Sequence, residues 1–186
     1  MKLKKINAIL AVVSTVAMLV HIGYTDFAYL TMYYNPFLKR LTSLPFMIAT
    51  CLHAVCGMSA VFMQSDGTRL DLYPEQNKKT IVQRLSAALI FPLLLLHINT
   101  FDLLKSCAES GNTVCFVLLL ISQPIFYGVI FAHTSVSFSR SLITLGILSS
   151  RERQKTIDRI AGISSVVLFA VTVFAVIKGQ LAMFRI

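Results

Sequence analysis

Hydrophobic and polar residues follow one another along this chain in long blocks rather than alternating residue by residue. Five predominantly apolar runs are separated by shorter segments that carry most of the charges. Each run has about the 20 residues that a helix needs to cross the hydrocarbon core of a bilayer. The pattern predicts an all-α integral membrane protein with five transmembrane helices, at residues 6–30, 44–63, 81–104, 114–138 and 160–177.

The first apolar run follows Lys2, Lys4 and Lys5, as the core of a signal peptide would. It is longer than a signal-peptide core, however, and no small-residue cleavage site ends it. We therefore expect residues 6–30 to be retained as a membrane helix.

The composition excludes a soluble domain. Of the 186 residues, 56% are hydrophobic and 13% are charged, whereas a soluble domain usually has about 25% charged residues. A net charge of +9 can indicate nucleic-acid binding, but in a membrane protein basic residues orient loops at the cytoplasmic surface. We expect one transmembrane domain over residues 1–186 and no nucleic-acid partner.

The distribution of Lys and Arg predicts the orientation. With a cytoplasmic amino terminus, twelve basic residues lie inside and five outside, as the positive-inside rule requires. This predicts a multi-pass protein of a prokaryotic cytoplasmic membrane, with its carboxyl terminus outside. The longest connection, residues 64–80, then lies inside and contains an expected turn at Asp66-Gly67. The outer five are Lys39, Arg40, Lys105, Lys178 and Arg185.

The four cysteines show no metal-ligand or haem-attachment spacing. Cys51 and Cys56 lie in an apolar run and are interpreted as packing residues. Cys107 and Cys115 flank a short loop, and they can form a disulfide if that loop faces an oxidising compartment.

The chain has four histidines, and one falls in each of the first four apolar runs. A single membrane histidine can simply pack in a bundle and bond a backbone carbonyl. Depth provides a further test, because helix residues rise by about 1.5 Å each. On that basis His21 and His97 form an outer pair. His133 lies in the inner part of the bilayer and His53 nearer mid-depth, so His53 joins His133 in an inner pair by elimination as much as by depth.

Two stacked histidine pairs in a four-helix bundle are typical of two b-type haems, each with two axial histidines. Zinc or copper is less favoured, because no carboxylate or thiolate joins the histidines at a common depth. Gly57 and Ser137 follow His53 and His133 by four residues and can leave room for a flat macrocycle. They can equally be small residues of ordinary membrane helix packing.

Haem propionates need cationic or hydrogen-bonding partners. Arg140 follows His133 by seven residues, two turns along the same helix face, and is the first candidate. Arg84, at the inner start of the third helix, is the second. Both can instead anchor the helices at lipid headgroups.

At this point the sequence resembles the dihaem cytochrome b membrane anchor of succinate:quinone oxidoreductases, the succinate dehydrogenase and fumarate reductase family. That type has five helices with one axial histidine on each of the first four, paired as inferred from depth. Residues 83–87 (Gln-Arg-Leu-Ser-Ala) are similar to the family's His-Arg-x-Ser-Gly helix opening, and residues 53–57 to its His-x-x-x-Gly segment. The sequence departs from the first motif at Gln83 and Ala87. Phe131 stands where some members have a proton-conducting Glu.

The resemblance implies an electron relay between a cytoplasmic iron-sulfur subunit, itself bound to a flavoprotein, and a membrane quinone, expected to be menaquinone. The polypeptide itself would have no succinate site and no flavin. The cofactors implied are two b-type haems, and the complex can form homodimers.

A quinone site needs hydrogen-bonding groups near the bilayer edge, because quinone redox chemistry also moves protons. Candidates at the outer ends of the first and third helices are Tyr24, Asp26, Tyr29, Asn99 and Asp102. Asp26 is the candidate proton acceptor, although it can also be an exposed carboxylate that ends a helix. An inner site would use Thr80 and Arg84.

Two other functions remain open. One is another class of membrane cytochrome b, such as a hydrogenase or ferric-reductase type, although the latter usually has two histidines on one helix. The other is a haem-free membrane component of a secretion or pilus assembly machine, in which the four histidines would be dispensable.

Overall fold

The protein is all-α over the part of the chain that its computed structural model describes, residues 2–62 and 74–184. The side chains of residues 74–76 are not included in this description, and the turn expected at Asp66-Gly67 lies outside it. Each of the five helices is long and apolar enough to cross a membrane. They are α1 (Lys2–Thr31), α2 (Pro36–Phe62), α3 (Pro74–Glu109), α4 (Thr113–Thr144) and α5 (Arg151–Phe184).

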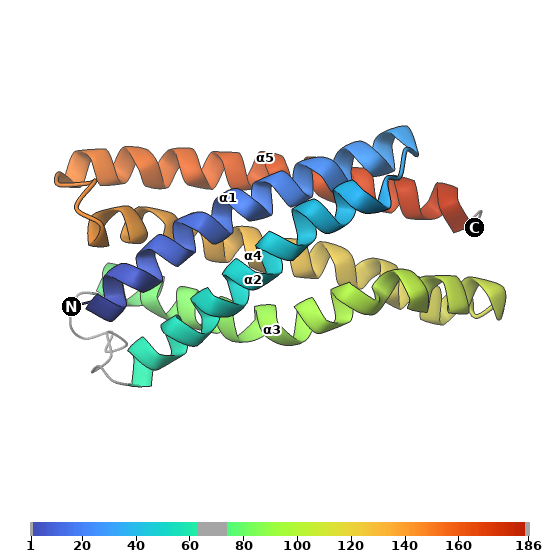
Figure 1. Ribbon diagram of the computed structural model, residues 1–186, viewed down its shortest axis with the longest axis horizontal. Helices are drawn as coiled ribbons and strands as arrows, with labels where there is room; N and C mark the ends of the chain where they lie inside the picture. The colour runs from blue at the N-terminus through green and yellow to red at the C-terminus, as the bar shows by residue number, and fades with distance from the viewer. Residues whose placement is uncertain (1, 63–73, 185–186) are drawn as a thin grey trace.

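The helices lie lengthwise in one elongated bundle, with the two chain termini at opposite ends (Figure 1). The short connections at residues 32–35 and 110–112 make hairpins of α1 with α2 and of α3 with α4. Packing is most extensive within these hairpins and between α4 and α5, and α1 also packs against α5 and α4. Among the described residues, α2 and α3 have no comparable contact. The bundle therefore consists of two hairpins joined through α1, α4 and α5.

The five predicted membrane runs each fall on one helix, apart from residue 63, which lies outside the described residues. The helices are longer than the runs: α5, for example, begins at Arg151 rather than at residue 160. Hydropathy identifies only the segment inside the hydrocarbon, whereas the hydrogen-bonded helix continues through the charged flanks. The 36 residues of α3 span about 54 Å at about 1.5 Å per residue, against a hydrocarbon core of about 30 Å.

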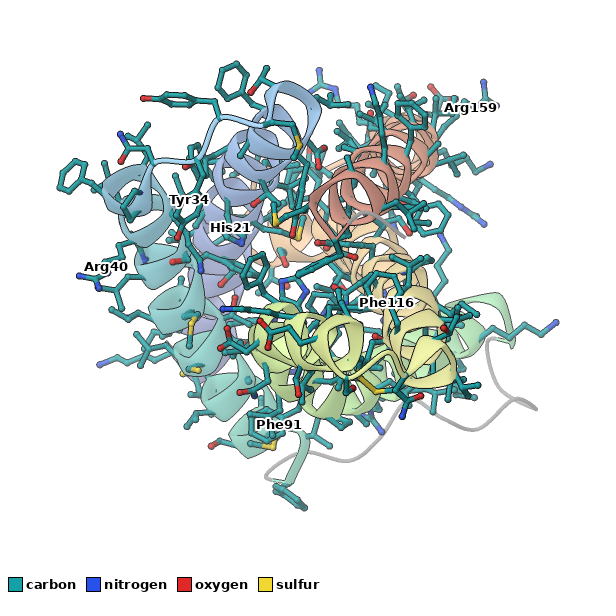
Figure 2. The ribbon with its side chains drawn as sticks, turned by 90° about the vertical axis from the view of Figure 1, so that its right-hand side faces the viewer. His21, Tyr34, Arg40, Phe91, Phe116 and Arg159 are labelled. Carbon is teal, nitrogen blue, oxygen red and sulfur yellow. A yellow bond between two sulfur atoms is a disulfide. The ribbon has the colours of Figure 1, made fainter. Side chains whose placement is uncertain are left out.

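The bundle interior is apolar and includes Met18 and Ile22 of α1, Leu94 of α3, and Phe126 and Ile130 of α4. Large apolar side chains also cover the outside of the bundle, as a membrane-embedded surface requires. In the view along the bundle, Arg40 and Arg159 point outward from its rim, while Phe116 lies inside (Figure 2).

The two connections at the end that carries the carboxyl terminus are both fixed by side chains. The Tyr24 hydroxyl donates to the backbone carbonyl of Asn35 over 2.8 Å and accepts from its backbone N–H over 2.9 Å. Cys107 and Cys115 form a disulfide across the other connection. At the opposite end, Lys79 of α3 and Asp158 of α5 form an ion pair of 2.8 Å.

Gly179 marks a close approach of α5 to α1, because an added Cβ there would overlap the Tyr29 side chain. Gly179→Ala is therefore expected to lower the free energy of unfolding by about 1–3 kcal/mol, the usual cost of overpacking a core. Thermal unfolding in detergent measures the effect. Gly162→Ala is the matched control on the same helix, since a Cβ there meets no atom within 4 Å. Equal Tm values for the two variants would contradict the close packing of α1 and α5.

Candidate functional site

The outer histidines, His21 of α1 and His97 of α3, line the same internal cavity. His21 lies inside the bundle in the view along its axis (Figure 2). Phe46 of α2 and Phe126 and Tyr127 of α4 complete much of the cavity wall. The bundle thus brings together two histidines that are 76 residues apart in sequence, from the two different hairpins.

The inner histidines, His53 of α2 and His133 of α4, also face each other across the two hairpins. Their ring centroids are 6.4 Å apart, with an angle of 61° between the ring planes. Two imidazoles bound to opposite sides of one metal ion, with metal–nitrogen bonds of about 2 Å, have centroids roughly 6 Å apart. The inner pair therefore has the spacing of two axial ligands.

His133 is oriented by the neighbouring helix α3. Its Nδ1 lies 3.1 Å from the backbone carbonyl of Gln83 and 3.0 Å from Oγ of Ser86. The Ser86 hydroxyl lies 2.6 Å from the Val82 carbonyl and donates its proton there. Because a carbonyl can only accept, Nδ1 of His133 must carry the ring proton. The other ring nitrogen, Nε2, is then an unprotonated electron-pair donor.

The outer histidines are held in the same way by the second helix of their own hairpin. Nδ1 of His97 lies 2.8 Å from Oε1 of Gln123, and the ring stacks on Phe126 with centroids 4.5 Å apart. Nδ1 of His21 lies 3.4 Å from Oγ1 of Thr42, and its ring stacks on Phe46 at 5.7 Å. No hydrogen bond engages Nε2 of either ring within the described residues.

His53 differs from the other three, because its buried Nδ1 has no hydrogen-bond partner within the described part of the chain. Several other buried polar atoms on α1, α2 and α4 share this property. Polar atoms inside a membrane bundle are costly without a partner, so this inner half of the bundle is suited to a ligand with polar groups. The atoms are Oδ1 of Asn7, Oγ of Ser14, Oγ1 of Thr50 and Oγ of Ser137.

The cavity between His21 and His97 has a volume of about 20 Å³, enough for about one water molecule. A flat macrocycle needs more space than this. The hairpins would have to separate on the side where α2 and α3 make little contact. The two histidines of each pair therefore lie near one another, whereas the helix spacing is that of a closed bundle.

The first propionate candidate, Arg140, turns toward α3. Its Nη1 donates to Oγ1 of Thr80 over 3.0 Å and to Oε1 of Gln83 over 2.9 Å. The backbone carbonyl of Gln83 accepts from His133. Gln83 therefore connects Arg140, through its side chain, to the inner pair, through its backbone. Arg84, the second candidate, is half-buried at the start of the same region of α3. Both remain predictions.

The two small residues near the inner pair have different surroundings. Gly57 lies at the contact between α1 and α2, where an added Cβ would meet Oδ1 of Asn7 at 3.6 Å. Ser137 is buried on α4, one turn beyond His133. Gly57 itself therefore faces α1 of its own hairpin.

The outer quinone candidates divide into two groups. On α1, Oδ2 of buried Asp26 accepts from the Thr172 hydroxyl over 3.0 Å, and the Tyr29 hydroxyl accepts from Gln180 over 3.4 Å. Both contacts face α5. Tyr24, on the same helix, instead donates its hydroxyl proton to the Asn35 carbonyl in the connection to α2.

The candidates on α3, Asn99 and Asp102, have exposed side chains. Asn99 donates to the Leu95 carbonyl of its own helix over 2.8 Å. No hydrogen bond joins these two residues to the α1 group within the described residues, so the structure does not bring the five candidates into one cluster. At the opposite end, Thr80 is bonded to Arg140.

Several neutral polar residues that the sequence did not propose as site residues surround the histidines, Asp26 and Tyr29. They carry no charge and most lie within apolar runs, so charge and hydropathy do not distinguish them. Their spacing relative to the histidines on the adjacent helix is a signal that could have indicated them, and Gln83 and Ser86 also belong to the segment 83–87 quoted above. They are Thr42, Gln83, Ser86, Thr100, Gln123, Thr172 and Gln180.

No group of three or more His, Cys, Asp or Glu side chains within the described residues is placed to hold a metal ion. The histidine pairs are thus two-ligand arrangements. The chain matches no protein family model, no curated protein and no solved structure.

Proposed function

We propose that this protein is a dihaem cytochrome b membrane anchor of a succinate dehydrogenase or fumarate reductase complex. His21 and His97 would be the axial ligands of an outer haem, and His53 and His133 those of an inner haem. Bound b-type haem would supply a one-electron redox centre at each pair.

The observation that carries the proposal is the hydrogen bonding of the paired rings. Nδ1 of His133 bonds Gln83 and Ser86 of the adjacent helix, and Nδ1 of His97 bonds Gln123. Metal-bound histidines usually donate their other ring N–H to a protein acceptor, which fixes the tautomer and the ring orientation. The same hydrogen bonds leave Nε2 as the ring nitrogen of neutral His133 and His97 that is free to bind a metal.

The proposed relay needs a proton acceptor where quinone reacts, and Asp26 is the favoured group. Its side chain is 8% exposed, and Oδ1 has no hydrogen-bond partner within the described residues. A buried carboxylate inside a membrane segment is costly and is a functional-site hypothesis by default. We therefore favour a quinone site, expected to take menaquinone, near Asp26 and Tyr29 over the inner alternative at Thr80 and Arg84.

The proposed orientation has the amino terminus in the cytoplasm of a prokaryote. The disulfide between Cys107 and Cys115 supports it, because disulfides persist in oxidising compartments. After reduction, an impermeant thiol reagent added to whole cells should label these cysteines, and labelling only in inverted vesicles would contradict the orientation.

The proposed partner subunits dock at the end of the bundle opposite the Cys107–Cys115 disulfide. There the first turns of α5 carry exposed Arg151, Arg153, Lys155 and Arg159, a basic surface suited to the iron-sulfur subunit that binds the flavoprotein. Complexes of this kind can also pair as homodimers.

The proposal is tested by the optical spectrum of membranes that contain the protein. Dithionite reduction should produce a b-type spectrum with about two haems per chain, because each haem needs one histidine pair. A protein purified with no haem would overturn the proposal and leave the haem-free assembly component as the remaining function. One haem per chain would contradict the two-pair arrangement.

A further inference from the structure

Gln123 is a buried polar side chain, and the proposed function uses only its contact with His97, not the other hydrogen bonds that it makes. It lies on α4 and is 2% exposed. Phe126 and Tyr127 lie three and four residues further along and contact His97 of α3 with ring centroids 4.5 Å and 5.7 Å away. Residues at these spacings share one helix face, so one face of α4 surrounds the His97 ring.

The oxygen and the nitrogen of the Gln123 side-chain amide contact different partners. Oε1 lies 2.8 Å from Nδ1 of His97. Nε2 donates to Oγ1 of Thr100 over 2.9 Å and to Oγ of Ser122 over 3.1 Å. All the polar atoms of the side chain are therefore in hydrogen bonds, as a buried amide requires.

The two hydroxyls determine which way the amide faces. Thr100 donates its proton to the Leu96 carbonyl over 2.8 Å, and Ser122 donates to the Leu119 carbonyl over 2.6 Å. Each hydroxyl has one proton, so both must accept from the amide NH₂ group. Oε1 is then the atom left for His97, whose Nδ1 must carry a proton in order to donate to it.

We infer that Gln123 is a positioning residue, which through Thr100 and Ser122 holds His97 as the neutral Nδ1–H tautomer with Nε2 available to the outer haem iron. The inference rests on the proposed function for the identity of the metal group. The tautomer itself follows from the protein hydrogen bonds alone.

The strength of this hydrogen bond also sets the electron donation of the ligand. A stronger acceptor at Nδ1–H makes the imidazole more basic, and hydrogen bonding around the ligands tunes the reduction potential of a haem. A neutral amide is a weaker acceptor than a carboxylate. Gln123→Glu is therefore expected to lower the midpoint potential of the outer haem.

The matched test compares Gln123→Glu, Gln123→Leu and Thr100→Val with Ser86→Ala, whose hydroxyl lies beside His133 of the inner pair. Redox titration of the haem spectrum is the first measurement. We expect Gln123→Glu to shift the outer haem alone and Gln123→Leu to weaken outer-haem binding about 10–100-fold. Thr100→Val should have a smaller effect in the same direction as Gln123→Leu, and Ser86→Ala should affect only the inner haem.

The second measurement does not depend on haem. Imidazole ¹⁵N chemical shifts of His97 in the haem-free protein should report a protonated Nδ1 and an unprotonated Nε2. A protonated Nε2 in the wild type would overturn the inference, as would unchanged potential and binding of the outer haem in the Gln123 variants. If the wild type binds no haem but His97 has the expected tautomer, the proposed function fails and the positioning role of Gln123 stands.

Discussion

The His97→Ala variant is expected to retain about one haem per chain instead of about two, because each b-type haem is held by its axial ligands and by packing. His97 is the most closely held of the four rings, through Gln123, Phe126 and Tyr127. The remaining haem should be the inner one, since His53 and His133 lie on α2 and α4 and contact each other, whereas within the described residues no hydrogen bond or ring contact joins either of them to His97. The pyridine haemochrome assay and redox titration measure the number and potential of the haems.

Two controls separate loss of a ligand from misfolding. Asn99→Ala changes an exposed side chain two residues away and should keep both haems. Added imidazole should restore the outer haem of His97→Ala by occupying the space of the deleted ring. A His97→Ala protein that keeps two haems with unchanged potentials would exclude His97 as a ligand.

The His133→Ala variant is expected to have the larger effect on function. It removes one of the two inner rings, and it leaves the Gln83 carbonyl and the Ser86 hydroxyl without the imidazole N–H. The outer haem should still be reduced by dithionite, which reaches it directly. It should no longer be reduced by succinate through the partner subunits, because the inner site would be the entry point for electrons.

The matched variant for this experiment is Ser135→Ala, on the same helix, where the hydroxyl donates to the Ala132 carbonyl of its own helix. It should keep succinate-dependent reduction. Succinate-dependent reduction of the outer haem at the wild-type rate in His133→Ala would refute an inner relay site, even if total haem content had fallen.

The sequence was sufficient to predict the five helices, and it also predicts which histidines lie at similar heights along the bundle. Five apolar runs each became one helix, because a span needs many apolar residues and a few polar ones do not hide the pattern. Depth follows directly from residue number at a fixed rise per residue. For this reason residues as distant in sequence as His21 and His97 could be expected at one level, and they do line one cavity. Their role as haem ligands stays a prediction.

The rotation of each helix about its axis could not be predicted in the same way. The sequence predicts similar depths for Asp26 and Asn99, but Asp26 faces Thr172 of α5 and Asn99 is exposed. Which face a membrane helix buries depends on packing with its neighbours, and nearly every face of these helices is apolar. Because helix rotation could not be predicted, the contact between Gln123 and His97 could not be predicted either; it depends on how α4 packs against α3.

The two hairpins also suggest how the protein is assembled. Each hairpin contains two histidines, and three of the four rings have contacts within their own hairpin. These are His21 with Thr42 and Phe46, His97 with Gln123, and His133 with Gln83 and Ser86. A hairpin can therefore insert into the membrane with most of its proposed ligands already oriented, before it meets the other. Each proposed axial pair takes one histidine from each hairpin, so haem would act as the cross-link that completes the bundle. Membrane insertion and cofactor loading would then be separate stages in the maturation of the chain.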